Sequence, residues 1–166
     1  MQQNHLYYGN FSEDDRNTFI ASMLISAGFH VKDQTRKSTT ETGKSAGEVD
    51  IFIEDINGYP LSIIVALNLS SVVKDYIKTH IDKIFTYDAN GLKDNYILVY
   101  ADVKDFGSFY NRYLDFIKNH DFKYPLITLV EDNSVEFSDL RKFTIVHNPN
   151  GTNVNMHHIV MNLAKK

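Results

Sequence analysis

Two short strands joined by an Asn-Gly turn constrain this chain more than any other feature. The segment GEVDIFIEDINGYPLSIIVALNL runs from Gly47 to Leu69. Asn57-Gly58 is a strong hairpin signal, because both residues accept positive φ angles at low cost. The residues before the turn are β-branched and aromatic, and those after Pro60 form a nearly continuous apolar run, which is typical of a strand buried on both faces. We therefore expect an antiparallel hairpin made of residues 48–54 and 61–67.

The rest of the chain alternates between helical and strand-like periodicity. Helices are expected from the N-cap Ser12 to Gly28, from Ser70 to Asn90-Gly91, and over residues 105–119, and further strands are expected at 29–33, 96–101, 125–130, 143–147 and 154–163. In the first helix, an apolar face is predicted from the spacing of Phe19, Ile20, Met23, Leu24 and Ala27. This order predicts an α/β fold with a central mixed sheet flanked by helices.

Length and composition indicate one domain, residues 1–166, with an ordinary globular apolar fraction of 43%. The absence of cysteine excludes disulfide scaffolds, thiolate zinc sites and cysteine nucleophiles. A net charge of −4 does not fit a protein that coats nucleic acid, but it leaves room for a nuclease with a local basic patch. Neither a signal peptide nor an apolar run of about 18 residues is recognisable, so we expect a cytoplasmic protein without a membrane partner.

A polar stretch from Gln34 to Ala46 has no apolar residue to anchor it apart from Ala46 at its edge. We expect a mobile loop there, and its cations Arg36, Lys37 and Lys44 are candidates for guiding nucleic acid.

Two acids stand at the beginning of the hairpin. Glu48 and Asp50 are two residues apart, so in a strand they point to the same face. Carboxylate oxygens suit hard cations, and the pair is therefore a candidate site for Mg²⁺ or Mn²⁺, or for acid–base chemistry. The alternative is a pair of solvated carboxylates at a strand end.

The order helix, three strands, helix, strand resembles the αβββαβ core of the PD-(D/E)XK, or restriction-endonuclease-like, nuclease superfamily. The stretch GEVDIFIE resembles the strand that carries that family's first acid, which would be Asp50. The run HIDKIFTYDANGL resembles a stretch of restriction-endonuclease-like proteins in bacterial defence systems. Glu13 and Arg16 resemble the acid and the base found on the family's first helix, and the resemblance covers residues 12–101.

The next strand departs from the family pattern of an acid, one spacer residue and a lysine. Within Ile64-Val65-Ala66-Leu67-Asn68, Val65 takes the place of the acid and Leu67 that of the lysine. A register shifted by one residue offers Ala66 and Asn68, which still lacks the acid. The resemblance therefore implies the fold more firmly than the activity.

What remains of the family's chemistry falls on a few residues. The resemblance makes Asp50 a metal ligand, with Glu48 or Glu13 completing the acid shell. On the helix after the hairpin, Lys83 would stand in for the missing lysine and His80 would contact a phosphate. The alternative for Glu13 is an acid that matches the helix dipole, and for His80 and Lys83 a hydrogen-bonded histidine and a solvated lysine.

Two other motifs do not support a site. His157 and His158 are adjacent, so in a strand they point in opposite directions and do not share a zinc ion easily. The triplet Gly43-Lys44-Ser45 lacks the upstream glycine of a phosphate-binding loop, since position 38 is serine.

The sequence thus predicts a divergent PD-(D/E)XK nuclease-like domain of a bacterial or phage defence system, with an incomplete metal site and weak or no DNA cleavage. One alternative is an active Mg²⁺-dependent DNA endonuclease with a rearranged site. The other is a non-catalytic domain that binds a partner protein or a second copy of itself. An active enzyme is expected to keep a wet, acidic pocket beside Asp50, whereas in an inactive one Val65 and Leu67 close that region with apolar contacts.

Overall fold

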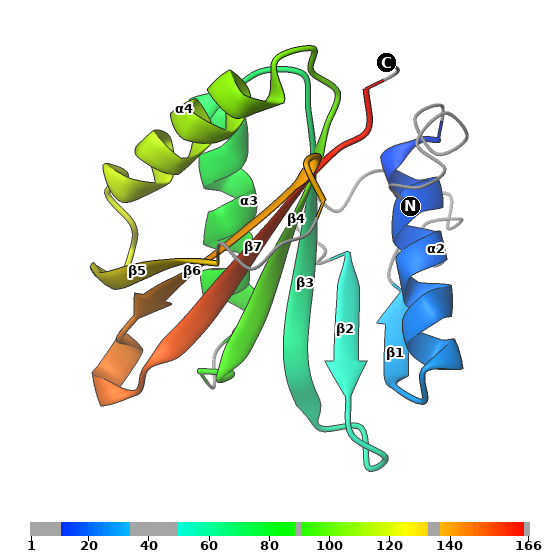
Figure 1. Ribbon diagram of the computed structural model, residues 1–166. Coiled ribbons are helices and arrows are strands. Elements are labelled where there is room, and N and C mark those ends of the chain that lie inside the picture. Colours follow the sequence, from blue (N-terminus) through cyan, green and yellow to red (C-terminus); the bar gives the residue numbers. More distant parts are fainter. Residues whose placement is uncertain (1–10, 34–49, 89–90, 133–136, 165–166) are drawn as a thin grey trace, which may run out of the picture.

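The computed structural model describes residues 11–33, 50–88, 91–132 and 137–164 and shows an α/β fold built on a seven-stranded mixed sheet (Figure 1). The elements are α2 (Glu13–Ser26), β1 (His30–Asp33), β2 (Ile51–Glu54), β3 (Pro60–Leu69), α3 (Lys74–Tyr87), β4 (Asp94–Ala101), α4 (Phe106–Lys118), β5 (Leu126–Asp132), β6 (Leu140–His147), the short 3₁₀ helix η3 (Pro149–Gly151) and β7 (Val154–Asn162). The predicted fold class, a mixed sheet flanked by helices, is confirmed.

The strands lie in the order β1-β2-β3-β4-β7-β6-β5. β2 and β3 pair antiparallel across the predicted turn, where Gly58 has a φ of 82°. β4 lies beside β3 and runs parallel to it, and β7 continues this parallel centre. The predicted hairpin and the position of the 96–101 strand are both confirmed. The described part of the first hairpin strand begins at Ile51, so the predicted residues 48 and 49 lie outside it.

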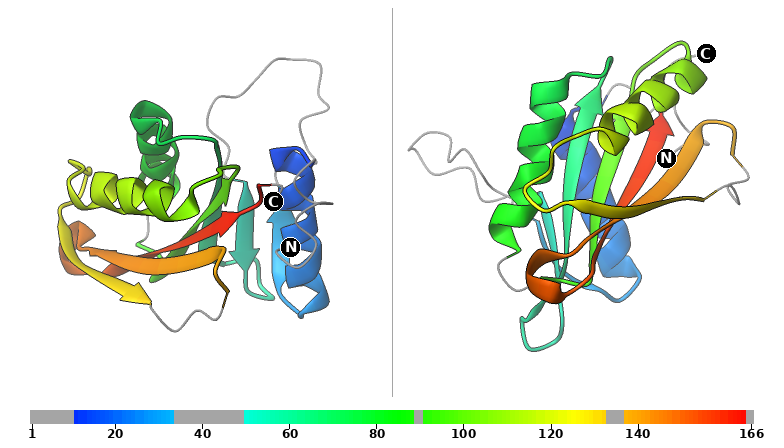
Figure 2. Two further views of the ribbon diagram at one scale, coloured as in Figure 1. Left: turned by 45° about the horizontal axis from the view of Figure 1, so that its top comes forward. Right: turned by 90° about the vertical axis from the view of Figure 1, so that its left-hand side faces the viewer.

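Helices cover the two faces of the sheet unequally (Figures 1 and 2). α3 and α4 pack on one face, where the alternate residues Ile63, Val65 and Leu67 of β3 join the larger apolar core. On the other face, α2 packs over the β1 to β4 side, with Ala21 buried against the intervening β3 positions Ile64 and Ala66. The polar cluster described below lies where α2 and α3 approach the carboxyl end of β3.

The first helix begins as predicted. The Ser12 hydroxyl accepts a hydrogen bond from the Asp15 backbone N–H at 3.1 Å, while the Asp15 carboxylate accepts from the Ser12 backbone N–H at 3.2 Å. This reciprocal pair is a capping box, which satisfies two N–H groups at the helix start. At the other end, Gly28 follows the C-cap residue Ala27 with a φ of 92°, as expected for a glycine just past a helix.

The buried face of α2 differs from the prediction. Ile20 and Leu24 are partly buried and pack against the core as predicted, but Met23 is 55% exposed. The fully buried residues of the helix are Arg16, Asn17 and Ala21. The apolar pattern predicted the buried face only in part, because Arg16 and Asn17 also lie on it and find hydrogen-bond partners on β3 and β4.

The second helix begins later than predicted, at Lys74 rather than at Ser70. Its N-cap residue is Val73, whose side chain makes no capping hydrogen bond. The Gln34 to Ala46 stretch, with its predicted mobility, lies outside the described residues. None of the helices in the described part of the chain has the length and apolar character that crossing a membrane requires.

Candidate functional site

Polar side chains from four elements meet at the carboxyl end of β3 and β4. They come from the beginnings of α2 and α3 and from the last residues of β3 and β4, and they are joined by the residue before β2: Glu13, Arg16, Asn17, Asp50, Asn68, Tyr76 and Tyr100. In sheets with parallel strands, the crevice beyond the carboxyl ends is a common place for ligands. We refer to these seven residues as the acid–arginine cluster.

Asp50 lies directly before β2 and is half-buried. Its Oδ2 accepts a hydrogen bond from the backbone N–H of Ala66 at 2.7 Å. The last ladder pair here is Ile51 with Ile64, so the carboxylate takes up a backbone donor of β3 beyond that pair. This bond holds the Asp50 side chain against β3 and engages one of its two oxygens.

Glu13 is the first residue of α2 and lies beside Asp50. The Tyr76 hydroxyl donates a hydrogen bond to Glu13 Oε2 at 3.3 Å. Burial raises the pKa of Glu13, and the negative charge of Asp50 raises it further. Burial and the Glu13 charge also raise the pKa of Tyr76 to about 12, so its hydroxyl stays a donor at neutral pH. The structure therefore brings together two of the three predicted acids, and the environment disfavours the charge of one of them.

Arg16 is held beside these acids by contacts on several sides. Only 4% of the residue is exposed. Its Nη1 donates to Asn68 Oδ1 at 2.6 Å, and its guanidinium carbon lies 5.3 Å from the centre of the Tyr100 ring. Tyr100 in turn donates from its hydroxyl to Asn17 Oδ1 at 3.2 Å. These contacts fix the guanidinium group, whose positive charge acts on the Glu13 side of the cluster.

The two predicted residues of α3 lie at the border of the cluster. Tyr76, His80 and Lys83 are four and three residues apart, so they share one side of the helix. The His80 Nδ1–H donates to the Tyr76 carbonyl at 2.8 Å, and burial lowers the pKa of His80. This arrangement matches the hydrogen-bonded histidine that was the alternative for His80. The positive charge of Lys83 acts to lower the pKa of Glu13, which places this lysine on the Glu13 side of α3.

The second acid that the resemblance implies has no counterpart in either register of β3. Val65 and Leu67 are completely buried in the core between the sheet and helices α3 and α4. Ala66, on the other face, is 1% exposed, and Asn68 is taken up by Arg16. Within the described ranges, no group of three or more histidine, aspartate or glutamate side chains is arranged to hold a metal ion. Glu48, the remaining predicted ligand, lies outside the described residues.

Three members of the cluster were not expected as site residues. Tyr76 carries the hydroxyl that binds Glu13, and Tyr100 and Asn17 support Arg16. Tyr100 stands in the apolar run 96–101 and Tyr76 has Ile77 as its apolar neighbour, so both read as core residues. A buried tyrosine usually finds a partner for its hydroxyl. The need of a buried tyrosine hydroxyl for a hydrogen-bond partner could have indicated these residues, but it does not identify the partner.

The adjacent histidines of β7 point to opposite faces, as predicted. His158 is completely buried on the α4 side, where its ring stacks on Phe143 with centroids 4.4 Å apart. His157 lies on the other face and donates from Nε2 to Asp94 Oδ1 at 2.8 Å.

Comparison with known proteins adds no assignment, because no family model, no curated protein and no solved structure matches the chain.

Proposed function

We propose that this chain is a divergent PD-(D/E)XK nuclease-like domain of a bacterial or phage defence system, with an incomplete metal site and weak or no DNA cleavage. The observation that carries the proposal is that one predicted acid lies beside Asp50, whereas the positions expected for a second acid and a lysine are apolar. Glu13 lies beside this acid, as the resemblance implies, whereas Val65 and Leu67 fill the apolar core where the resemblance implies an acid and a lysine. The observed order α2, β1, β2, β3, α3, β4 supports the same reading.

The chemistry of the cluster explains why metal binding would be weak. Mg²⁺ keeps its waters unless several oxygen ligands compete with them. Asp50 has one oxygen engaged by the Ala66 N–H, and burial favours the protonated form of Glu13. A divalent ion would have to hold Glu13 ionised against that preference, with Arg16 repelling it from close by. The site would therefore bind Mn²⁺ or Mg²⁺ far less tightly than a site with two ionised acids.

One observation favours the active alternative. Lys83 lies close enough for its charge to act on Glu13, so a lysine is available near the acids, although it comes from α3 rather than β3. In an active enzyme, Lys83 would polarise the attacking water while the metal neutralises the phosphate.

The test is a plasmid-cleavage assay with Mg²⁺ and with Mn²⁺ on the wild type, Asp50→Asn and Glu13→Gln. Asp14→Asn is the matched control, since Asp14 is an exposed acid in the same helical turn. We expect feeble or absent cutting that none of the three variants changes. Robust cutting that Asp50→Asn abolishes and Asp14→Asn leaves intact would establish the active alternative instead.

DNA binding separates the proposal from the protein-interaction alternative. We expect a labelled duplex to bind with an affinity that falls as salt rises, because contacts to phosphates release counterions. A chain that neither cuts nor binds DNA, but forms a stable dimer in light scattering, would favour the interaction domain. Val65→Glu is not a useful probe of activity, because it places a carboxylate in the fully buried core.

A further inference from the structure

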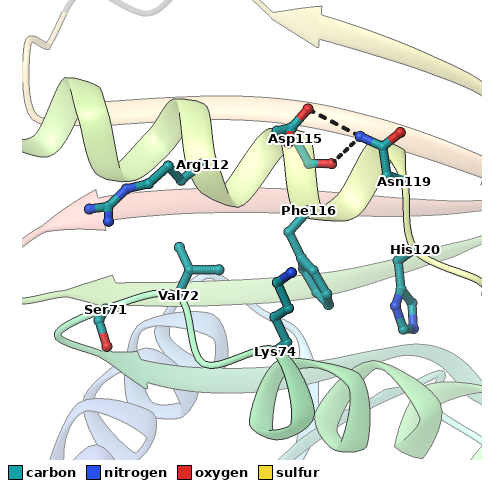
Figure 3. A pocket seen from close by; sticks show the side chains of 8 residues that line it. All are labelled: Ser71, Val72, Lys74, Arg112, Asp115, Phe116, Asn119 and His120. Carbon is teal, nitrogen blue, oxygen red and sulfur yellow. Dashed lines mark hydrogen bonds between the residues drawn. The ribbon is translucent and has the colours of Figure 1, made fainter.

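A second polar site lies on the α3 and α4 face of the sheet, away from α2 (Figure 3). It is a pocket of about 450 Å³ between the start of α3 and the second half of α4. Its walls are Ser71, Val72, Lys74, Arg112, Asp115, Phe116, Asn119 and His120. Its volume falls in the range of small-molecule sites in proteins, about 300–1,000 Å³.

One end of the pocket is basic. Figure 3 shows the Arg112 guanidinium and the Ser71 hydroxyl at this end, with Lys74 between them and the aromatic residues. In the part of the chain that the structure describes, neither Lys74 nor Arg112 forms an ion pair, and Arg112 is engaged only through Nε, which donates to the Ser108 carbonyl at 3.3 Å. Two cations that form no ion pair within the described residues, and a serine hydroxyl, all on the walls of one pocket, are a suitable binding set for phosphate oxygens.

The start of α3 adds to this basic end. Val73 caps this 14-residue helix without a side-chain hydrogen bond, so its own side chain leaves the first N–H groups of the helix unsatisfied. The positive end of the α3 dipole therefore lies at Lys74, on the wall of the pocket. Phosphates bind favourably at such a helix start.

The other end of the pocket is aromatic and carries groups for hydrogen bonding. Phe116 and His120 stand together with ring centroids 5.0 Å apart. His120 Nε2 is buried without a hydrogen-bond partner among the described residues, which leaves it free to bond a ligand. Asp115 is the one acid of the wall, and Asn119 donates to its Oδ1 at 3.1 Å. A carboxylate beside an amide accepts hydrogen bonds from hydroxyl or amino groups, and it repels a second anion.

We propose that this pocket binds a nucleoside monophosphate. The phosphate lies at the basic end, between Lys74 and Arg112 and against Ser71. The planar base lies against Phe116 and His120, where stacking on aromatic rings stabilises any base. The sugar hydroxyls or base amino groups face the acid and amide of α4. In this arrangement the phosphate lies away from Asp115, the acid of the pocket wall. An inorganic anion would leave the aromatic end of the pocket and Asp115 without a partner.

The test is a titration of the full chain with AMP, with adenosine and with inorganic phosphate, followed by calorimetry or by NMR. We expect saturable AMP binding, with adenosine and phosphate each at least tenfold weaker, since each engages only one end of the pocket. Lys74→Gln and Arg112→Gln are each expected to weaken AMP binding at least tenfold. Lys93→Gln is the matched control, because Lys93 is an exposed lysine at the opposite, amino end of β4, and it is expected to leave the affinity unchanged.

Three results would overturn the proposal. The first is the absence of saturable binding at millimolar AMP. The second is phosphate binding as tight as AMP binding, which would reduce the site to a simple anion site. The third is an equal loss of affinity in Lys93→Gln, which would assign the binding to overall charge. Lys74 and Arg112 are exposed, so their variants are expected to unfold at the wild-type temperature, which thermal melting checks. The acid–arginine cluster contains none of these residues, so cleavage assays and AMP binding fail or succeed independently.

Discussion

Glu13 is a residue whose surroundings oppose its charge, and this has a measurable consequence. Its pKa is raised in the folded state, so between the unfolded and the folded pKa the folded chain binds more protons. Stability is therefore lost as the pH rises through that window. Glu13→Gln keeps an acceptor for the Tyr76 hydroxyl and removes the charge beside Asp50. We expect this variant to raise the free energy of unfolding at neutral pH and to change it little near pH 4, about the unfolded pKa, as measured by urea denaturation.

The neighbouring Asp14 provides the contrast. It is exposed in the same first turn, where the helix dipole favours a negative charge. Asp14→Asn should therefore lower the free energy of unfolding at neutral pH, by about 0.3–1 kcal/mol. If Glu13→Gln is also destabilising at neutral pH, the Glu13 carboxylate is stabilised as an anion, and Lys83 rather than burial dominates its environment.

At the scale of single residues, the sequence indicated which residues belong to the site better than it indicated which residues they contact. Glu13, Asp50 and Lys83 were singled out, and the charges of Asp50 and Lys83 both act on Glu13. The bonds of Arg16 with Asn68 and of Tyr113 with His158 join residues that are 52 and 45 positions apart. Such pairs depend on the strand order of the whole sheet, and no local pattern in the chain encodes them.

Among the secondary-structure elements, α2 depends most on its cap. The buried residues of this helix are few, and its capping box satisfies two N–H groups that packing does not. We expect Ser12→Ala to lower the free energy of unfolding by about 1 kcal/mol, which thermal or urea denaturation will show. Ser22→Ala is the matched control, since Ser22 is an exposed serine of the same helix whose hydroxyl donates to the Thr18 carbonyl within that helix.

Because alanine is the better helix former, Ser22→Ala is expected to be neutral or slightly stabilising. Equal destabilisation by the two substitutions would mean that α2 gains nothing from the cap and is held by the sheet alone.

The elements show which local signals suffice. The hairpin followed from Asn57-Gly58 and the start of α2 from Ser12, because turns and caps are governed by nearest neighbours. The start of α3 was placed four residues early, since the serines after β3 look like a cap but belong to the connection. The buried face of α2 was predicted only in part, because Arg16 and Asn17 also lie on it and their partners come from other elements.

The whole molecule carries a buried histidine whose titration is coupled to unfolding. His158 lies between Phe143 and Tyr113, with its Nδ1 2.9 Å from the Tyr113 hydroxyl oxygen. Burial lowers the pKa of His158 to about 3. Because the unfolded pKa is about 6.5, the unfolded chain binds more protons between these values. Stability is therefore fully present above about pH 6.5 and is lost as the pH falls toward 3.

The double variant His158→Phe with Tyr113→Phe removes both partners of this buried bond. Relative to it, the wild type is expected to lose about 1.4 kcal/mol of unfolding free energy per pH unit through the lower part of the window, which urea denaturation between about pH 7 and pH 4 measures. Parallel stability curves for the two proteins would show that His158 takes up its proton without unfolding.

The burial of Val65 has a consequence for how this chain could change. Its side chain is completely enclosed by the core that α3 and α4 build on the sheet. A carboxylate there would lose its hydration before any metal could compensate for it, at a cost of several kcal/mol, which is a large part of the roughly 5–15 kcal/mol that keeps a domain folded. A variant of this chain with a second acid on β3, whether evolved or designed, therefore needs looser packing around β3 before Val65 can be replaced. The two steps have to come in that order, because the core tolerates a carboxylate at position 65 only after water can reach it.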